Sequence, residues 1–301
     1  MKSIKLYFLV FLATVFSNIA LANEIKSEIE NKIYSKIDDF AQNIGKDLGE
    51  SLTSYENLKY LDFSINIHEG FDPSIELKSV SKLIEYEDGA LFNQLNLISQ
   101  DSKTTINLGI GQRKLLNNDT LMMGTNIFID YQFDESHLRS GLGFEAISNS
   151  LDLIANYYDA LSGFKSTSSG GREKALDGYD LKLNYHLSNK SKTDLFVQLF
   201  EWENPNSTYQ EKGDKVGMTS SIGNLALEIG YLDDNKDNDG IFGSLKIVIP
   251  LGEQKENLNE DKRNTNIKNA SVRNKLYMPV QRENKIKVVK ISKSGVKISG
   301  F

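Results

Sequence analysis

Residues 179–188 alternate strictly between apolar and polar side chains. One face carries Tyr179, Leu181, Leu183, Tyr185 and Leu187, and the other carries Asp180, Lys182, Asn184, His186 and Ser188. A period of two predicts a β-strand with two unlike faces. A strand of about ten residues that is apolar on one face and polar on the other is typical of the wall of a transmembrane β-barrel.

The same alternation recurs along most of the chain. It predicts twelve strands, over residues 57–68, 73–80, 91–99, 103–113, 120–131, 137–147, 150–160, 178–188, 193–203, 214–222, 224–232 and 240–250. An even number of strands suits a closed antiparallel barrel, in which the first strand begins and the last strand ends on the same side of the membrane. Alternation alone leaves a soluble β-sandwich open, because its charged faces meet water while its apolar faces pack together.

The N-terminus favours the membrane alternative. Lys2 and Lys5 precede an apolar run over residues 6–16, and Ala20-Leu21-Ala22 supplies small residues for a signal peptidase. This pattern predicts a secretory signal peptide over residues 1–22. The apolar run is shorter than the roughly 18 residues that a transmembrane helix requires, and no later run approaches that length.

The remaining chain divides into three parts. Residues 23–54 have apolar side chains every three or four positions, which predicts an amphipathic periplasmic helix. This helix could pair with its copy in a homodimer, lie on the inner membrane face, or pack under the barrel mouth. Residues 55–252 form the predicted barrel. Residues 253–301 begin with a charged, Asn-rich linker up to residue 269 and continue with one or two short strands.

Composition excludes several classes of function. The chain has no cysteine and a formal net charge of −6, so disulfides are excluded and nothing suggests a nucleic-acid partner. Its three histidines are far apart. The Asp- and Asn-rich run over residues 233–240 resembles a calcium loop, but Lys246 stands where such a loop needs Glu, so we expect a solvated turn. We assign no enzyme activity, no metal and no cofactor.

Two groups of residues have inward parity in the predicted barrel. The charged group is Arg113, Asp130, Arg139, Glu145, Asp180, Lys182 and Glu228, and the glycine group is Gly109, Gly111, Gly124, Gly141 and Gly143. Mixed charges favour ion pairs that brace the lumen over an ion-selective pore. Glycine weakens a strand unless something must approach closely. The glycines therefore indicate either relief of crowding or a lane along which the returning tail lies.

Several short motifs point to one family. GIGQR, NIFIDY, HLRSGLGFE and NYY occur in this order within residues 106–164, and DGYD follows within residues 172–185. Their order and spacing resemble the β-domain of inverse autotransporters, the intimin and invasin family. A fainter similarity continues in YMPVQRENKIKVV, residues 277–289.

The resemblance implies a twelve-stranded outer-membrane barrel with a periplasmic N-terminus, whose chain returns through the lumen to the cell surface. Such a barrel would contact outer-membrane lipid and would depend on periplasmic chaperones and the outer-membrane assembly machinery. Family members continue into passenger domains that bind host receptors, whereas we expect this chain to export only its own short C-terminal segment, residues 253–301. The alternative is a plain structural or porin-like barrel whose tail stays periplasmic or joins the wall.

Overall fold

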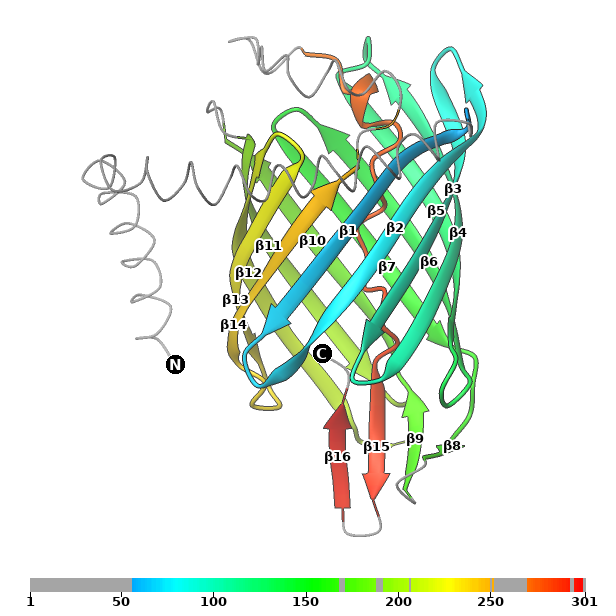
Figure 1. Ribbon diagram of the computed structural model, residues 1–301, viewed down its shortest axis with the longest axis vertical. Coiled ribbons are helices and arrows are strands. Elements are labelled where there is room, and N and C mark those ends of the chain that lie inside the picture. The colour runs from blue at the N-terminus through cyan, green and yellow to red at the C-terminus, as the bar shows by residue number, and fades with distance from the viewer. Residues whose placement is uncertain are drawn as a thin grey trace, which may run out of the picture. The chain divides into compact units, whose positions relative to one another are not determined.

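Twelve strands of the computed structural model close into one antiparallel barrel (Figure 1). The structure describes residues 56–167, 171–187, 192–205, 207–249, 251, 270–292 and 295–299. The barrel strands are β1 (Leu58–His68), β2 (Phe71–Tyr86), β3 (Gly89–Gln100), β4 (Lys103–Leu116), β5 (Leu121–Gln132), β6 (His137–Ser148), β7 (Leu151–Ala160), β10 (Asp177–His186), β11 (Lys192–Glu203), β12 (Gln210–Ile222), β13 (Leu225–Asp234) and β14 (Gly240–Val248). β1 pairs with β14, which closes the wall. The predicted fold class is confirmed.

All twelve predicted barrel strands are present, and their ends differ from the prediction where the alternation fails. β2 continues to Tyr86 although the pattern predicted an end at residue 80. Its pairing with β3 shifts register between Lys82 and Ile84, so adjacent apolar residues there break the period of two. The predicted signal peptide (1–22) and helix (23–54) lie outside the described residues, as does the charged linker over residues 253–269.

A small second sheet lies at one end of the barrel. It has the order β16-β15-β9-β8 and is built from β8 (Lys165–Ser166), β9 (Arg172–Ala175), β15 (Val288–Ser292) and β16 (Gly295–Ser299). β15 and β16 are the short strands that the sequence predicted in the tail. β8 and β9 belong to the connection between β7 and β10 and were not predicted, because they are too short to show a period.

The two faces of the wall follow the predicted parity. On β10, Tyr179 and Leu183 are 48% and 37% exposed, whereas Asp180 is 2% exposed. A sandwich would bury its apolar faces, so this outward apolar surface excludes that alternative and is typical of a surface in contact with lipid. In the described part of the chain no helix is long and apolar enough to cross a membrane.

The barrel has two ends, which we call the near end and the far end. β1 begins and β14 ends at the near end, and the small second sheet lies at the far end (Figure 1). The longest connection between barrel strands, which contains β8 and β9, is at the far end. A three-residue 3-10 helix, η2 (Arg273–Lys275), lies at the near end, where the chain re-enters the described structure after β14.

Candidate functional site in the barrel lumen

The C-terminal part of the chain passes through the barrel from the near end to the far end. At the near end, the amide of Val272 donates to the carbonyl of Asp119, in the turn between β4 and β5, at 2.7 Å. At the far end, the amide of Leu176 donates to the carbonyl of Lys287 at 2.9 Å. Residues 277–287, which we call the lumen segment, connect these two points inside the barrel (Figure 1). The predicted threading through the lumen is confirmed.

A buried carboxylate holds the middle of the lumen segment. Asp130 on β5 is fully buried, and Arg282 of the lumen segment binds both of its oxygens, at 2.7 and 2.8 Å. Arg139 on β6 donates to the same carboxylate at 2.8 Å, and Asn107 on β4 also donates at 2.8 Å. A buried ion pair is stable only when its remaining polar atoms are also satisfied, and this cluster meets that condition for the carboxylate.

Arg139 also fixes the position of the lumen segment along the barrel axis. Its two remaining amino groups donate to the carbonyls of Glu283 and Lys285, at 2.7 and 3.0 Å. Arg113 on β4, which lies closer to the near end, likewise binds both a wall carboxylate and backbone carbonyls. It pairs with Glu145 at 2.5 Å and donates to the carbonyls of Leu276 and Met278. Each arginine therefore joins a wall carboxylate to the backbone of the lumen segment, a combination that inward parity alone does not reveal.

Amide side chains complete the attachment, and the sequence analysis missed them. Gln94 accepts from the amide of Val280 at 2.7 Å, and Asn156 donates to the carbonyl of Gln281 at 3.0 Å. Further contacts join Asn284 to Asn96, Asn107 and Glu76, and Glu283 to Tyr158. These amides have the same inward parity as the charged candidates, so the alternation is the sequence signal that identifies them.

The other predicted lumen charges contact the wall. Asp180 accepts from Asn156 at 2.9 Å and from Tyr158 at 2.7 Å. The ammonium group of Lys182 lies 4.3 Å from the centre of the Phe196 ring. Glu228 accepts a hydrogen bond from Thr219 at 3.1 Å. Of the predicted lumen charges, Arg113 pairs with Glu145 and Arg139 pairs with Asp130, whereas the other three form no ion pair with a residue that the structure describes. That the two pairs brace the lumen stays a prediction.

The second sheet anchors the lumen segment where it leaves the barrel. β15 pairs with β9, with Val288 opposite Ala175. Next to this pair, the buried carboxylate of Glu173 accepts from Lys103 at 2.9 Å and contacts His137 at 3.1 Å. Burial alone would raise the pKa of Glu173, but the hydrogen bonds from His137 and Lys103 outweigh it and lower the pKa from its ordinary value.

The five glycines do not form a lane for the lumen segment, which corrects that interpretation. A Cβ atom on Gly109 would overlap Phe128, and one on Gly111 would overlap Phe92. Gly124 and Gly143 lie against Glu145 and Asn126 of neighbouring strands. Only Gly141 meets the lumen segment, since a Cβ atom there would be 2.9 Å from Arg282.

Two inward aromatic rings, those of Phe92 and Phe128, each cover a glycine of a neighbouring strand and have an arginine above the ring. Phe128 stands opposite both Gly109 and Gly141 in the strand register, and Arg282 lies 4.1 Å from the centre of its ring. Phe92 stands opposite Gly111 and has Arg113 at 4.6 Å from its ring centre. Glycine leaves room for the ring to lie flat on the wall, and the ring then supports the arginine that binds the lumen segment.

We expect Gly111→Ala to destabilise the barrel by about 1–3 kcal/mol, because the new methyl group displaces the Phe92 ring in a packed site. The temperature at which the folded band disappears in heat-modifiable gel electrophoresis should fall. Gly163→Ala is the matched control, because a Cβ atom there meets nothing within 4 Å. Adding Phe92→Leu to Gly111→Ala should restore part of the loss. An unchanged transition temperature for Gly111→Ala would contradict the role given to this pair.

The Asp- and Asn-rich run at the far end forms a turn held by its own side chains. Asp234 accepts from the amides of Lys236 and Asn238, at 2.7 and 3.1 Å. Within the described ranges, no group of three or more His, Cys, Asp and Glu side chains is arranged to hold a metal ion.

Comparisons with known proteins agree with this geometry. The family model "Inverse autotransporter, beta-domain" matches residues 13–284. The "Putative attaching and effacing protein homolog" of Escherichia coli (strain K12) is 31% identical over 134 residues, which cover 43% of this chain and 45% of that protein. Intimin of Citrobacter freundii is 28% identical over 172 residues, which cover 56% of this chain and 18% of intimin. Invasin of Yersinia enterocolitica is 28% identical over 187 residues, which cover 57% of this chain and 22% of invasin.

A solved structure supports the fold. It is described under "Unveiling the Mechanism Behind the in-meso Crystallization of Membrane Proteins", and it superposes with a TM-score of 0.67 at 21% identity, covering 79% of this chain and all of that one. The chain spans less than half the length of the curated relatives named above. The similarity therefore concerns the barrel and the segment inside it.

Proposed function

Because the chain belongs to the inverse autotransporter β-domain family, an outer-membrane barrel family, we propose that it brings the chain after its barrel to the cell surface and anchors it there. In this proposal the near end faces the periplasm and the far end faces the outside. The barrel is both the route of export and, once export is complete, the membrane anchor.

The observation that carries this proposal is the path of the lumen segment. β14 ends at the near end, yet β15 lies at the far end, so the chain between them crosses the barrel a thirteenth time, through its interior. A segment held by Arg113, Asp130 and Arg139 along its length has the geometry expected of a translocated chain that has come to rest.

Two further features support the orientation. Outer-membrane barrels have short periplasmic turns and longer extracellular loops, and the long connection with β8 and β9 is at the far end. The predicted signal peptide over residues 1–22 would deliver the N-terminus to the periplasm, and β1 begins at the near end. The name of one relative, "Putative attaching and effacing protein homolog", further suggests that an exported segment of this chain serves attachment.

Cysteine labelling on intact cells tests the orientation, and the chain has no native cysteine to interfere. We expect Ser299→Cys, after the lumen segment, and Asp72→Cys, at the far-end start of β2, to react with a membrane-impermeant maleimide. Glu87→Cys, in the near-end turn between β2 and β3, should react only after the outer membrane is opened.

The same three variants distinguish the alternative. Reaction at Asp72→Cys with protection of Ser299→Cys on intact cells would favour a plain barrel with a periplasmic tail. Reaction at Glu87→Cys with protection of the other two positions would reverse the proposed orientation of the barrel.

A further inference from the structure

The barrel holds the backbone of the lumen segment along most of its length. Backbone amides or carbonyls of the segment form hydrogen bonds with groups of the barrel at Met278, Val280, Gln281, Glu283, Asn284, Lys285 and Lys287. Every residue offers the same carbonyl, and every residue except proline offers the same amide. These contacts therefore favour a chain in the lumen, but they do not select which residue lies at which point along the barrel axis.

One side chain of the lumen segment occupies a site on the wall that is shaped for it. Arg282 binds both oxygens of Asp130, at 2.7 and 2.8 Å, and lies 4.1 Å from the centre of the Phe128 ring. Gly141 leaves room for the guanidinium, since a Cβ atom there would be 2.9 Å from Arg282. We call Asp130, Phe128 and Gly141 the arginine socket. A planar guanidinium suits it because guanidinium groups bind carboxylates through two parallel hydrogen bonds and stack on aromatic rings.

The residues next to Arg282 do not suit the socket. Residues 280–284 read Val-Gln-Arg-Glu-Asn, so a shift of the chain by one or two residues in either direction brings no other cation to Asp130. Such a shift also moves Arg282, whose side chain is 1% exposed, away from its carboxylate. A buried charge without its partner is strongly unfavourable, and single buried polar groups are known to fix register in coiled coils. The socket therefore distinguishes positions of the chain that the backbone contacts do not.

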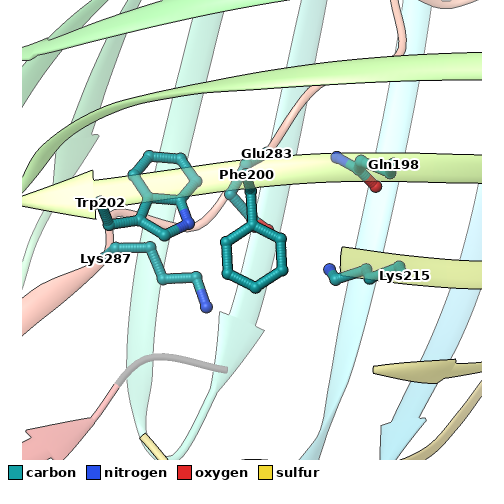
Figure 2. Close-up of a pocket in the computed structure, with 6 residues that line it drawn as sticks. All are labelled: Gln198, Phe200, Trp202, Lys215, Glu283 and Lys287. Atoms are coloured by element: carbon teal, nitrogen blue, oxygen red, sulfur yellow. The ribbon is translucent and has the colours of Figure 1, made fainter. Parts of the chain in front are cut away.

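The other charged side chains of the lumen segment have less demanding surroundings. Lys285 donates to the neutral amide of Gln100 at 2.7 Å, and Lys287 lies 3.9 Å from Glu211. Figure 2 shows a pocket beside the segment, lined by Gln198, Phe200, Trp202, Lys215, Glu283 and Lys287. Because space remains there, positions 283 and 287 constrain the size of their side chains less than the socket constrains Arg282.

Resting on the proposed export function, we propose that the arginine socket sets the point at which the exported chain stops. The chain advances through the lumen until Arg282 reaches Asp130, and this register determines which residues emerge at the far end as β15. Arg282 acts as a positioning residue, because it fixes the place of the residues that follow it.

Disulfide formation between β9 and β15 in the purified full chain reports the register. Val288 stands directly opposite Ala175 in this antiparallel pair, and directly opposite positions are close enough for a disulfide. The chain has no native cysteine. Ala175→Cys with Val288→Cys should therefore form a disulfide on mild oxidation, whereas Ala175→Cys with Lys290→Cys should form much less.

Moving the arginine should move the register. With Arg282→Gln and Asn284→Arg, the chain should rest two residues nearer the near end, so that Lys290→Cys replaces Val288→Cys as the partner of Ala175→Cys. With Arg282→Gln and Val280→Arg, the chain should rest two residues nearer the far end, and Ile286→Cys should become the partner. This second variant keeps Asn284 and its contacts with Asn96 and Glu76.

Two controls accompany the relocation variants. Arg282→Gln alone removes the same charge without offering a new one, so it should not favour either shifted disulfide. Arg282→Lys keeps a cation at the socket and should keep the native disulfide. The heat-modifiable gel shift identifies the folded barrel in each variant.

A native disulfide in both relocation variants would overturn the proposal, because the pairing of β15 with β9 would then set the register. A shifted disulfide that forms as readily in Arg282→Gln alone would overturn it as well. So would failure of both relocation variants to fold while Arg282→Gln alone folds, since the socket would then not accept a relocated arginine. The register is read in the purified barrel, so these outcomes are distinct from protection of Ser299→Cys on intact cells, which would contradict the export function itself.

Discussion

Replacing Arg282 by Gln should release the lumen segment from the wall while the barrel stays assembled. Arg282 makes two charge-assisted hydrogen bonds to Asp130, and the side chains of the two residues are 1% and 0% exposed. Removing one partner of such a pair costs about 3–5 kcal/mol, because it leaves buried polar groups without their partner. Local opening that becomes easier by about 3 kcal/mol speeds amide exchange by roughly a hundredfold. Hydrogen–deuterium exchange of a peptide that covers residues 277–287 measures this change.

Asp130 keeps Arg139 and Asn107 in this variant, so exchange in β5 and β6 should stay slow. Arg273→Gln is the matched control, because it also removes an Arg–Asp pair between the tail and the wall. That pair, with Asp119, is 44% and 28% exposed, and exposed pairs contribute about 0–1 kcal/mol. Equally small changes in both variants would show that the amide contacts, and not the buried ion pair, hold the lumen segment.

The barrel wall could be predicted from the sequence because the alternation of apolar and polar residues within each strand is enough to identify the strand and its two faces. Each strand meets lipid on one face and polar neighbours on the other, so parity alone separates Leu183 from Lys182. The burial of Asp130 and Arg139 follows from the same rule. Strand ends were less certain where a bulge interrupts the period, as in β2 near Lys82.

The attachment of the lumen segment could not be predicted, because it depends on register and on long-range contacts. Arg282 lies in a segment without periodicity, and its partner Asp130 is more than a hundred residues earlier in the chain. The glycines were found by parity, but parity does not say which side chain stands opposite. Only the register places Phe128 between Gly109 and Gly141 and so shows why both positions lack a side chain.

Leu183→Arg should prevent or weaken assembly of the barrel in the membrane. Leu183 lies on the outward face of β10, opposite Leu153 and Val197 of the adjacent strands, and all three are exposed. An arginine on the lipid face costs about 2–4 kcal/mol near the middle of the bilayer and less toward either interface. The fraction of membrane-associated chain with heat-modifiable mobility should therefore fall.

Lys182→Ser is the control for this prediction, because Lys182 is the adjacent residue on the same strand but faces the lumen. A polar side chain there replaces another polar side chain next to water, so assembly should remain close to that of the unchanged protein. Equal loss of assembly in both variants would mean that lipid does not distinguish the two faces of β10. Loss of assembly only in Leu183→Arg places the lipid boundary on the apolar face that the alternation predicts.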